Sequence, residues 1–360
     1  QPDFKDSEIL SLIKSAYSYT AEFGATSFED SKKVRDIKMR VIGGNDPAAI
    51  KSKFKDIPEA LLENEINKHK SELKQDEFWY YNEKEVIKMS TFRFKNYLEN
   101  NNISKYYPSA DSGYLFIKKD NDFITEFNEN RIKDFTLEDL LGRSEVEAYE
   151  LCANSMLTFS KNYLSLLGTS DIKIQRDTKN EAFVYYKNTA LKITKDDFQL
   201  MPYSELEGLV WENQVIDRDL KIEDESEGEF KTFIWKIAGE DKERYYTFKS
   251  VIGYLLHSYQ NEGKPKVIIF NDENIEDVPN GGSGKGLIHK GISHIKNLST
   301  INGKGFDPTT QFAYQTVSTD TQVLLFDDID KNFRFENLFS LITEGITIEK
   351  KGQDAIKIPF

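Results

Sequence analysis

A glycine-rich stretch in the last third of the chain has the residue types of a phosphate-binding loop. The stretch reads Pro279-Asn280-Gly281-Gly282-Ser283-Gly284-Lys285-Gly286. It follows an apolar run at 266–270 that we expect to be a buried strand, and apolar residues at helical spacing come after it. Glycines let successive backbone N–H groups turn toward an anion, and the N-terminus of a helix adds partial positive charge. We therefore predict that residues 280–286 bind the phosphates of a nucleotide and that Lys285 reaches the β- and γ-phosphates.

Two positions depart from the usual pattern G-x-x-x-x-G-K-[ST] of such loops. Pro279 stands where the first glycine would be, and Gly286 stands where a Ser or Thr hydroxyl normally helps to hold Mg²⁺. Asp272 and Glu273 follow the apolar run and are candidates for the missing metal contact, although a solvated acidic loop has the same composition. A glycine-rich surface turn is the alternative for the loop itself.

A second motif strengthens the nucleotide interpretation. Residues 322–328 form an apolar run that ends in Asp327 and Asp328. Acids at the carboxyl end of a buried strand lie where open α/β sheets bind ligands, and a divalent cation relieves the repulsion between neighbouring carboxylates. We expect Asp327 to hold Mg²⁺ directly or through water, and Asp328 to share the metal site and to orient or deprotonate the attacking water. The spacing allows the two roles to be exchanged, and a strand followed by an acidic turn is the plainer alternative.

The two motifs in this order resemble those of the superfamily 3 helicases of viruses, phages and mobile elements, and more narrowly the helicase part of poxvirus-type primase–helicases. The stretches that carry the resemblance are GGSGKGL (281–287), TQVLLFDDIDKNF (321–333) and LFSLITEGITIEKKGQDAIKIPF (338–360). The third stretch corresponds to a family motif that forms a hairpin pointing into the central channel of a ring. The resemblance implies that Lys350 and Lys351 contact the DNA backbone. From the residues alone, a Lys-Lys-Gly turn between two strands is usually a solvated hairpin tip.

The resemblance implies an ATP-dependent DNA helicase module of a phage or mobile-element primase–helicase. Such a module uses ATP and Mg²⁺, acts on single-stranded DNA in replication, and assembles as a homo-hexamer. The sensor asparagine and the arginine finger of the family would follow Phe360, so we expect a fragment that binds nucleotide weakly and unwinds nothing alone. Any primase active site would lie upstream of Gln1, because no cluster of paired carboxylates with strand context precedes residue 265.

Two alternatives stay open. Pro279 and Gly286 also suit a nucleotide-binding assembly protein that loads partners without unwinding DNA. An unrelated P-loop enzyme, such as a signalling ATPase or a kinase, would explain the nucleotide motifs but not the Lys350-Lys351 hairpin.

The secondary structure expected around these residues indicates an α/β plus α+β protein. We expect a helical region over 1–75, with helices near 9–17 and 58–73, and a small α/β unit over 76–142 that is compatible with a winged helix. An α+β domain over 143–245 would precede an incomplete P-loop ATPase domain over 246–360 with a central parallel sheet. Within these ranges we expect a long helix from Ser144 with Glu147 completing a capping box. We also expect two hairpins, over 114–127 and 182–194.

The composition excludes several classes of protein. The 360 residues carry 48 Lys and Arg against 61 Asp and Glu, a net charge of −13 that excludes a basic exterior but not a local basic channel. One cysteine excludes an internal disulfide, and the four histidines form no zinc pattern. No apolar run is long enough to cross a membrane and no signal peptide is visible, so we expect a cytoplasmic protein without a membrane partner.

Overall fold

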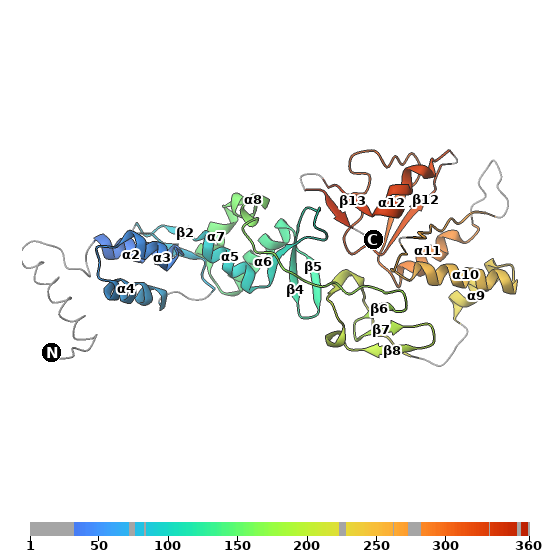
Figure 1. Ribbon diagram of the computed structural model, residues 1–360, viewed down its shortest axis with the longest axis horizontal. Helices are drawn as coiled ribbons and strands as arrows, with labels where there is room; N and C mark the ends of the chain where they lie inside the picture. Colours follow the sequence, from blue (N-terminus) through green and yellow to red (C-terminus); the bar gives the residue numbers. More distant parts are fainter. Residues whose placement is uncertain are drawn as a thin grey trace, which may run out of the picture. The chain divides into compact units, whose positions relative to one another are not determined.

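The computed structural model describes residues 32–71, 76–82, 84–222, 228–261, 263–272, 282–330, 332–350 and 354–358. The chain divides into two compact units, unit 1 over 1–104 and 127–168, and unit 2 over 105–126 and 169–360 (Figure 1). These units differ from the four consecutive ranges expected from the sequence. The chain enters unit 2 over 105–126 and then returns to unit 1. Both contain helices and strands, and the strands pair in parallel and antiparallel fashion, so the protein is a mixed α/β chain.

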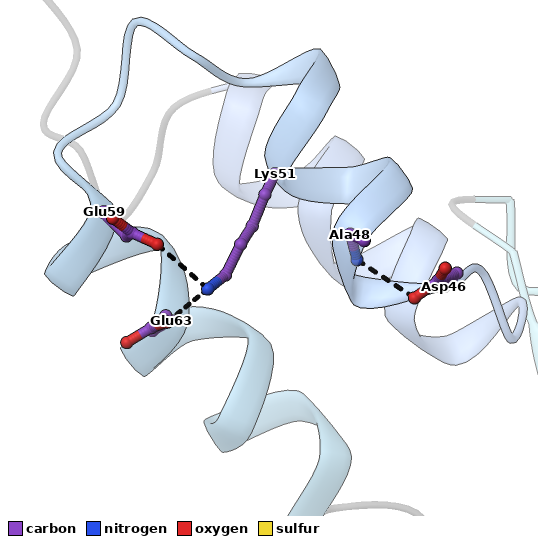
Figure 2. A network of polar contacts seen from close by, with 5 residues as sticks. All are labelled: Asp46, Ala48, Lys51, Glu59 and Glu63. Atoms are coloured by element: carbon purple, nitrogen blue, oxygen red, sulfur yellow. Dashed lines mark hydrogen bonds and ion pairs between the residues drawn. The ribbon is translucent and has the colours of Figure 1, made fainter.

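The described part of unit 1 begins with helices that enclose a mostly aliphatic core. They are α2 (Lys32–Ile42), α3 (Pro47–Lys53) and α4 (Glu59–Ser71). Asp46 caps α3 by accepting a hydrogen bond from the Ala48 amide, and Pro47 occupies the first helical position, where its missing N–H costs nothing. Figure 2 shows Lys51 reaching from α3 to Glu59 and Glu63 on α4. The helix expected near 9–17 lies outside the described residues.

The rest of unit 1 packs around aromatic rings. Its elements are β1 (Trp79–Tyr81), β2 (Ile87–Met89), α5 (Thr91–Asn100), α6 (Glu129–Gly142), α7 (Val146–Ala153), η1 (Met156–Phe159) and α8 (Lys161–Leu164). The ring of Phe94 makes edge contacts with Phe78 and Phe159.

The single long helix expected from Ser144 is wrong. Ser144 has a left-handed φ of 59°, and Glu145 precedes α7 without a side-chain cap, so the expected capping box does not form. The chain leaves the helix after Ala153, and Ser160 starts α8 by accepting a hydrogen bond from the Tyr163 amide. The apolar periodicity runs through all three short segments, and for that reason it did not reveal the breaks.

Unit 2 contains a sheet in which β5 pairs antiparallel with β4 and parallel with β9, and a second sheet of order β10-β6-β7-β8. The strands are β4 (Leu115–Asp120), β5 (Phe123–Glu126), β6 (Ala182–Tyr186), β7 (Thr189–Ile193), β8 (Phe198–Met201), β9 (Val210–Trp211) and β10 (Val215–Ile216). Strand β3 (Ile103–Tyr106) spans the boundary between the units. Both predicted hairpins are confirmed, as β4–β5 and β6–β7.

The end of unit 2 carries the motifs. It contains α9 (Glu229–Ile237), α10 (Lys242–Leu255), α11 (Lys285–Ser293), β11 (Leu298–Asn302), β12 (Val323–Asp327), η4 (Phe335–Leu338), α12 (Phe339–Glu344), β13 (Ile346–Ile348) and β14 (Ile356–Ile358). Figure 1 labels α11 in orange and β12, α12 and β13 in red. Strands β11 and β12 are parallel, and β13 and β14 form an antiparallel hairpin.

The strand expected at 266–270 does not form within the described residues. Val267 and Ile269 are 51% and 63% exposed, whereas Phe270 packs against the cluster around α11. The stretch is thus covered on one side only and pairs with no described strand. The central parallel sheet expected for a P-loop domain is, in the described part of unit 2, the β11–β12 pair alone. No helix among the described residues is long and apolar enough to cross a membrane.

Candidate functional site

Lys285 is the first residue of α11 and follows a turn that only glycine accommodates easily. Gly282 and Gly284 have φ values of 95° and 87°, in the left-handed region where side chains are strained. This backbone brings the chain into the N-terminus of α11, whose free N–H groups favour an anion. Residues 282–286 thus have the local form expected for a phosphate-binding turn, while Asn280 and Gly281 lie outside the described residues.

The Lys285 ammonium is held by two polar groups. Its Nζ donates to Asp272 Oδ1 at 2.5 Å and to Ser283 Oγ at 3.0 Å. The ammonium and then the Ser283 hydroxyl hold the pKa of Asp272 below its usual range, so this carboxylate is charged at neutral pH. Sequence reasoning considered Asp272 as a metal contact and missed it as the partner of Lys285. The signal was its place two residues after the apolar run at 266–270.

Asp327 and Asp328 lie at the carboxyl end of β12 with exposed carboxylates. Asn302, the last residue of β11, is the register partner of Asp327, so both strands end at the same edge. The Gly303 amide donates to the Asp327 carbonyl at 2.5 Å, and a β-carbon on Gly303 would lie 2.8 Å from that oxygen. A side chain would therefore push the loop away from the end of β12.

The loop after β11 also contacts the acids beyond β12. Lys304 Nζ lies 3.6 Å from Asp328 Oδ2, and the Gly305 amide donates to Asp330 Oδ2 at 2.8 Å. Asp328 has a left-handed φ of 54°, which turns the chain directly after the strand. Asp328 thus stands at a sharp turn, with the ammonium of Lys304 within ion-pair distance of its carboxylate.

The helix that starts at Lys285 packs against the strand that ends at Asp327. Ile288 and Ile292 of α11 form a buried cluster against which Val323 of β12 is packed. On the same helix, burial lowers the pKa of His289 and the nearby charge of Asp327 opposes that shift. The two nucleotide motifs therefore belong to one packed substructure.

The described residues contain no cluster of three or more His, Cys, Asp or Glu side chains that could hold a metal ion by itself. Mg²⁺ is commonly bound by one or two carboxylates together with waters and substrate phosphates. Asp327 and Asp328 fit that type of site, in which the nucleotide completes the ligand set.

Lys350 follows β13 and is half-buried, and Lys351 lies outside the described residues. Ile348 of β13 and Ile356 of β14 are buried in a core cluster that also contains Ile301 of β11. Leu324 and Phe326 of β12 pack against that cluster. The strand that ends in the two acids thus contacts α11 through one cluster and the hairpin through another.

Lys350 lines a small pocket at this end of the hairpin. The other residues around it are Leu115, Glu126, Ser318, Thr319, Ile348 and Ile356. The lining thus brings Lys350 together with two hydroxyl-bearing residues and one acidic residue.

The chain matches no protein-family model, no curated protein and no solved structure.

Proposed function

We propose that this chain is the ATP-dependent DNA helicase module of a phage or mobile-element primase–helicase that acts in DNA replication in the cytoplasm. The observation that carries the proposal is the packing of a glycine-turn helix, which starts at Lys285, against a strand that ends in Asp327 and Asp328. The N-terminus of the helix, with its lysine, offers groups for the phosphates of ATP–Mg²⁺, and the two carboxylates at the end of the strand offer groups for its metal.

In the proposed reaction the triphosphate lies at the N-terminus of α11. Lys285 exchanges the Asp272 carboxylate for oxygens of the β- and γ-phosphates, and the backbone N–H groups of the turn donate to the same phosphates. Asp327 holds Mg²⁺, which when bound neutralises charge that develops on the transferred phosphoryl group. Asp328 orients or deprotonates the attacking water. Gly286 supplies no hydroxyl to the metal, so these carboxylates carry a larger share of its binding.

Packing around β12 supports a helicase over another P-loop enzyme. The residues of β12 that precede the acids contact the cluster containing Ile348 and Ile356, the buried residues of the hairpin that bears Lys350. A displacement of β12 during the ATP cycle would therefore press on the base of that hairpin, since close-packed cores transmit strain. In a homo-hexameric ring the hairpin lysines of all copies gather on one strand of DNA, which accommodates a net charge of −13.

The test is ATP hydrolysis by the full-length protein with and without single-stranded DNA, measured as phosphate release. We expect stimulation by single-stranded DNA and its loss in both Lys285→Ala and Asp327→Ala. Stimulated hydrolysis that survives in both variants would contradict the proposal.

A second candidate is a nucleotide-binding assembly protein that does not unwind DNA. Gly286 favours it, because this position offers the metal no hydroxyl. The discriminating measurement is nucleotide affinity with and without Mg²⁺. Equal affinity without turnover would support the assembly protein, whereas Mg²⁺-dependent turnover would support the helicase.

A further inference from the structure

The hairpin β13–β14 is fastened by a loop from a distant part of the sequence. That loop, residues 109–113, connects β3 to β4 and lies in the range that the sequence assigns to the accessory α/β unit. We propose that the 109–113 loop is a positioning segment that fixes the register and direction of the β13–β14 hairpin. The inference rests on the proposed function, because it assigns the loop a part in the coupling of the hairpin to DNA.

Three hydrogen bonds join the loop to the hairpin. The Gly113 amide donates to the Ala355 carbonyl at 3.0 Å, and the Lys357 amide donates to Ser112 Oγ at 3.0 Å. Ser109 Oγ donates to the Lys357 carbonyl at 3.3 Å. Both backbone polar groups of Lys357 are thus occupied by serine hydroxyls of the loop, on a strand whose described ladder runs to β13 alone.

Gly113 allows the closest approach in this contact. A β-carbon on Gly113 would lie 2.8 Å from Asp354 Cβ and 2.9 Å from the Ala355 carbonyl oxygen, closer than real β-carbons approach other atoms. The φ of Gly113 is outside the left-handed region, so the position requires glycine for space and not for backbone conformation. Any side chain would push residues 354–355 away from the loop.

The loop leads directly into the hydrophobic core against which the hairpin packs. Two residues after Gly113, Leu115 begins β4, and it is buried in one cluster with Ile117, Ile348 and Ile356. The loop and the hairpin thus share a rigid base, and the hydrogen bonds fix how one lies on the other. A two-stranded hairpin with strands of three residues is only marginally stable in water, so its position must come from such outside contacts.

The consequence concerns Lys350. Only Glu349 separates this lysine from the end of β13, so a tilt or slip of the hairpin would carry it away from the position at which the other subunits place theirs. The loop is therefore expected to act on stimulation by DNA through the hairpin, without touching nucleotide or DNA.

The test compares Gly113→Ala with Gly142→Ala, a control position where a β-carbon meets no atom within 4 Å. The first readout is amide hydrogen exchange at Gly113 and Lys357. The second is the ratio of stimulated to basal ATP hydrolysis, measured against a single-stranded oligothymidylate. Ser112→Ala, which removes the acceptor for the Lys357 amide and adds no bulk, is a milder second variant in case Gly113→Ala does not fold.

We expect exchange at the two amides to rise about tenfold or more in Gly113→Ala, because they lose their acceptors. We expect the ratio of stimulated to basal hydrolysis to fall about fivefold or more, as for misplaced functional groups in general. Ser112→Ala should raise exchange at Lys357 alone, and Gly142→Ala should change neither readout.

Two results would overturn the inference. Unchanged exchange in Gly113→Ala would show that the loop does not hold the hairpin, and raised exchange with an unchanged hydrolysis ratio would show that holding it has no functional consequence. Failure of the proposed function looks different. The parent protein would then show no stimulation, whereas the exchange measurement would still report on the contact between loop and hairpin.

Discussion

Two lysines in different regions of the molecule pair with carboxylates in similar ways, and only one of them lies at a candidate site. Lys51 in unit 1 donates to Glu59 Oε1 at 3.1 Å and also to Glu63 (Figure 2). Lys285 in unit 2 donates to Asp272 Oδ1 at 2.5 Å. Both side chains are about one-third exposed. Neither the distance nor the burial separates a structural ion pair from a functional one.

The two lysines differ in the end of the helix at which they lie. Lys51 lies in the last turn of α3, where free carbonyl groups favour a cation, so the helix and the two glutamates stabilise the same charge. Lys285 lies in the first turn of α11, where free N–H groups favour an anion. Asp272 then satisfies a lysine that its own helix end disfavours. A cation placed against its helix dipole, beside a glycine turn, indicates a site prepared for a negatively charged ligand.

The most direct test of the difference between the two lysines is to remove each of them in turn. Lys285→Ala is expected to lower DNA-stimulated ATP hydrolysis by about 100-fold or more, because it removes a charge that faces the transferred phosphoryl group. Lys51→Ala is expected to leave hydrolysis unchanged, since its partners bind the helices of unit 1 together. Phosphate release measures both, and equal losses in the two variants would show that the helix ends do not distinguish the lysines.

A chemical probe of unit 1 shows whether that unit stays folded in the Lys51 variant. Cys152 is 1% exposed, and burial raises the pKa of its thiol to about 12. At pH 9 we expect iodoacetamide to alkylate it about 100-fold or more slowly than an unfolded cysteine, because the thiolate is the reacting form. Rapid alkylation of the native parent protein would contradict the packing of unit 1. Slow alkylation in the Lys51 variant would show that unit 1 is intact.

The raised pKa of Cys152 also makes the free energy of unfolding depend on pH. An unfolded thiol ionises near pH 9 and the folded one near pH 12, so the folded state binds more protons across this window. The free energy of unfolding is therefore expected to fall as the pH rises from 9 to 12, by up to about 1.4 kcal/mol per pH unit from this residue. Comparison of the parent with Cys152→Ala by denaturant unfolding isolates the contribution.

Another experiment removes the carboxylate that competes with phosphate. Asp272→Asn is expected to tighten nucleotide binding about five- to tenfold, because Lys285 no longer has to leave a charged partner. The pKa of Asp272 is lowered, so the pair is intact above the usual carboxyl range and is lost only as the pH falls through the lowered value. Competition is therefore fully present at neutral pH. Titration with a fluorescent nucleotide measures the affinity.

The matched control for that experiment is Glu63→Gln, which removes an acid from Lys51 and should leave nucleotide affinity unchanged. Weaker binding in Asp272→Asn would contradict the competition and would place Asp272 among the groups that hold Lys285 or the metal in a productive position.

Much of the local structure was predictable because its causes are local. The β4–β5 and β6–β7 hairpins follow from strand-forming runs separated by short turns, and the glycine turn before Lys285 follows from the residues themselves. The features that the sequence did not predict depend on distant partners. The run at 266–270 is apolar enough for a strand but has no described neighbour to pair with, and nothing in the residue order joins Asp272 to Lys285 or Gly113 to Ala355.

The smallest expected effect concerns the binding of Mg²⁺. It tests whether the metal lies near Lys285 at the start of α11. A β-carbon on Gly286 meets no atom within 4 Å, so Gly286→Ser should fit without strain and return the hydroxyl that phosphate-binding loops normally carry. We expect the half-saturating concentration of Mg²⁺ for hydrolysis to fall about threefold, since one more oxygen becomes available to a site built from two carboxylates.

Gly286→Ala is the matched control, because both substitutions improve helix propensity and only serine adds the oxygen. A fall in half-saturating Mg²⁺ for Ser but not for Ala would assign the effect to the hydroxyl and place the metal beside Lys285, as hydrolysis requires. Equal behaviour of the two variants would place the metal away from the first turn of α11. The helix end would then attract phosphate without helping to cleave it, and the nucleotide would serve assembly and not unwinding.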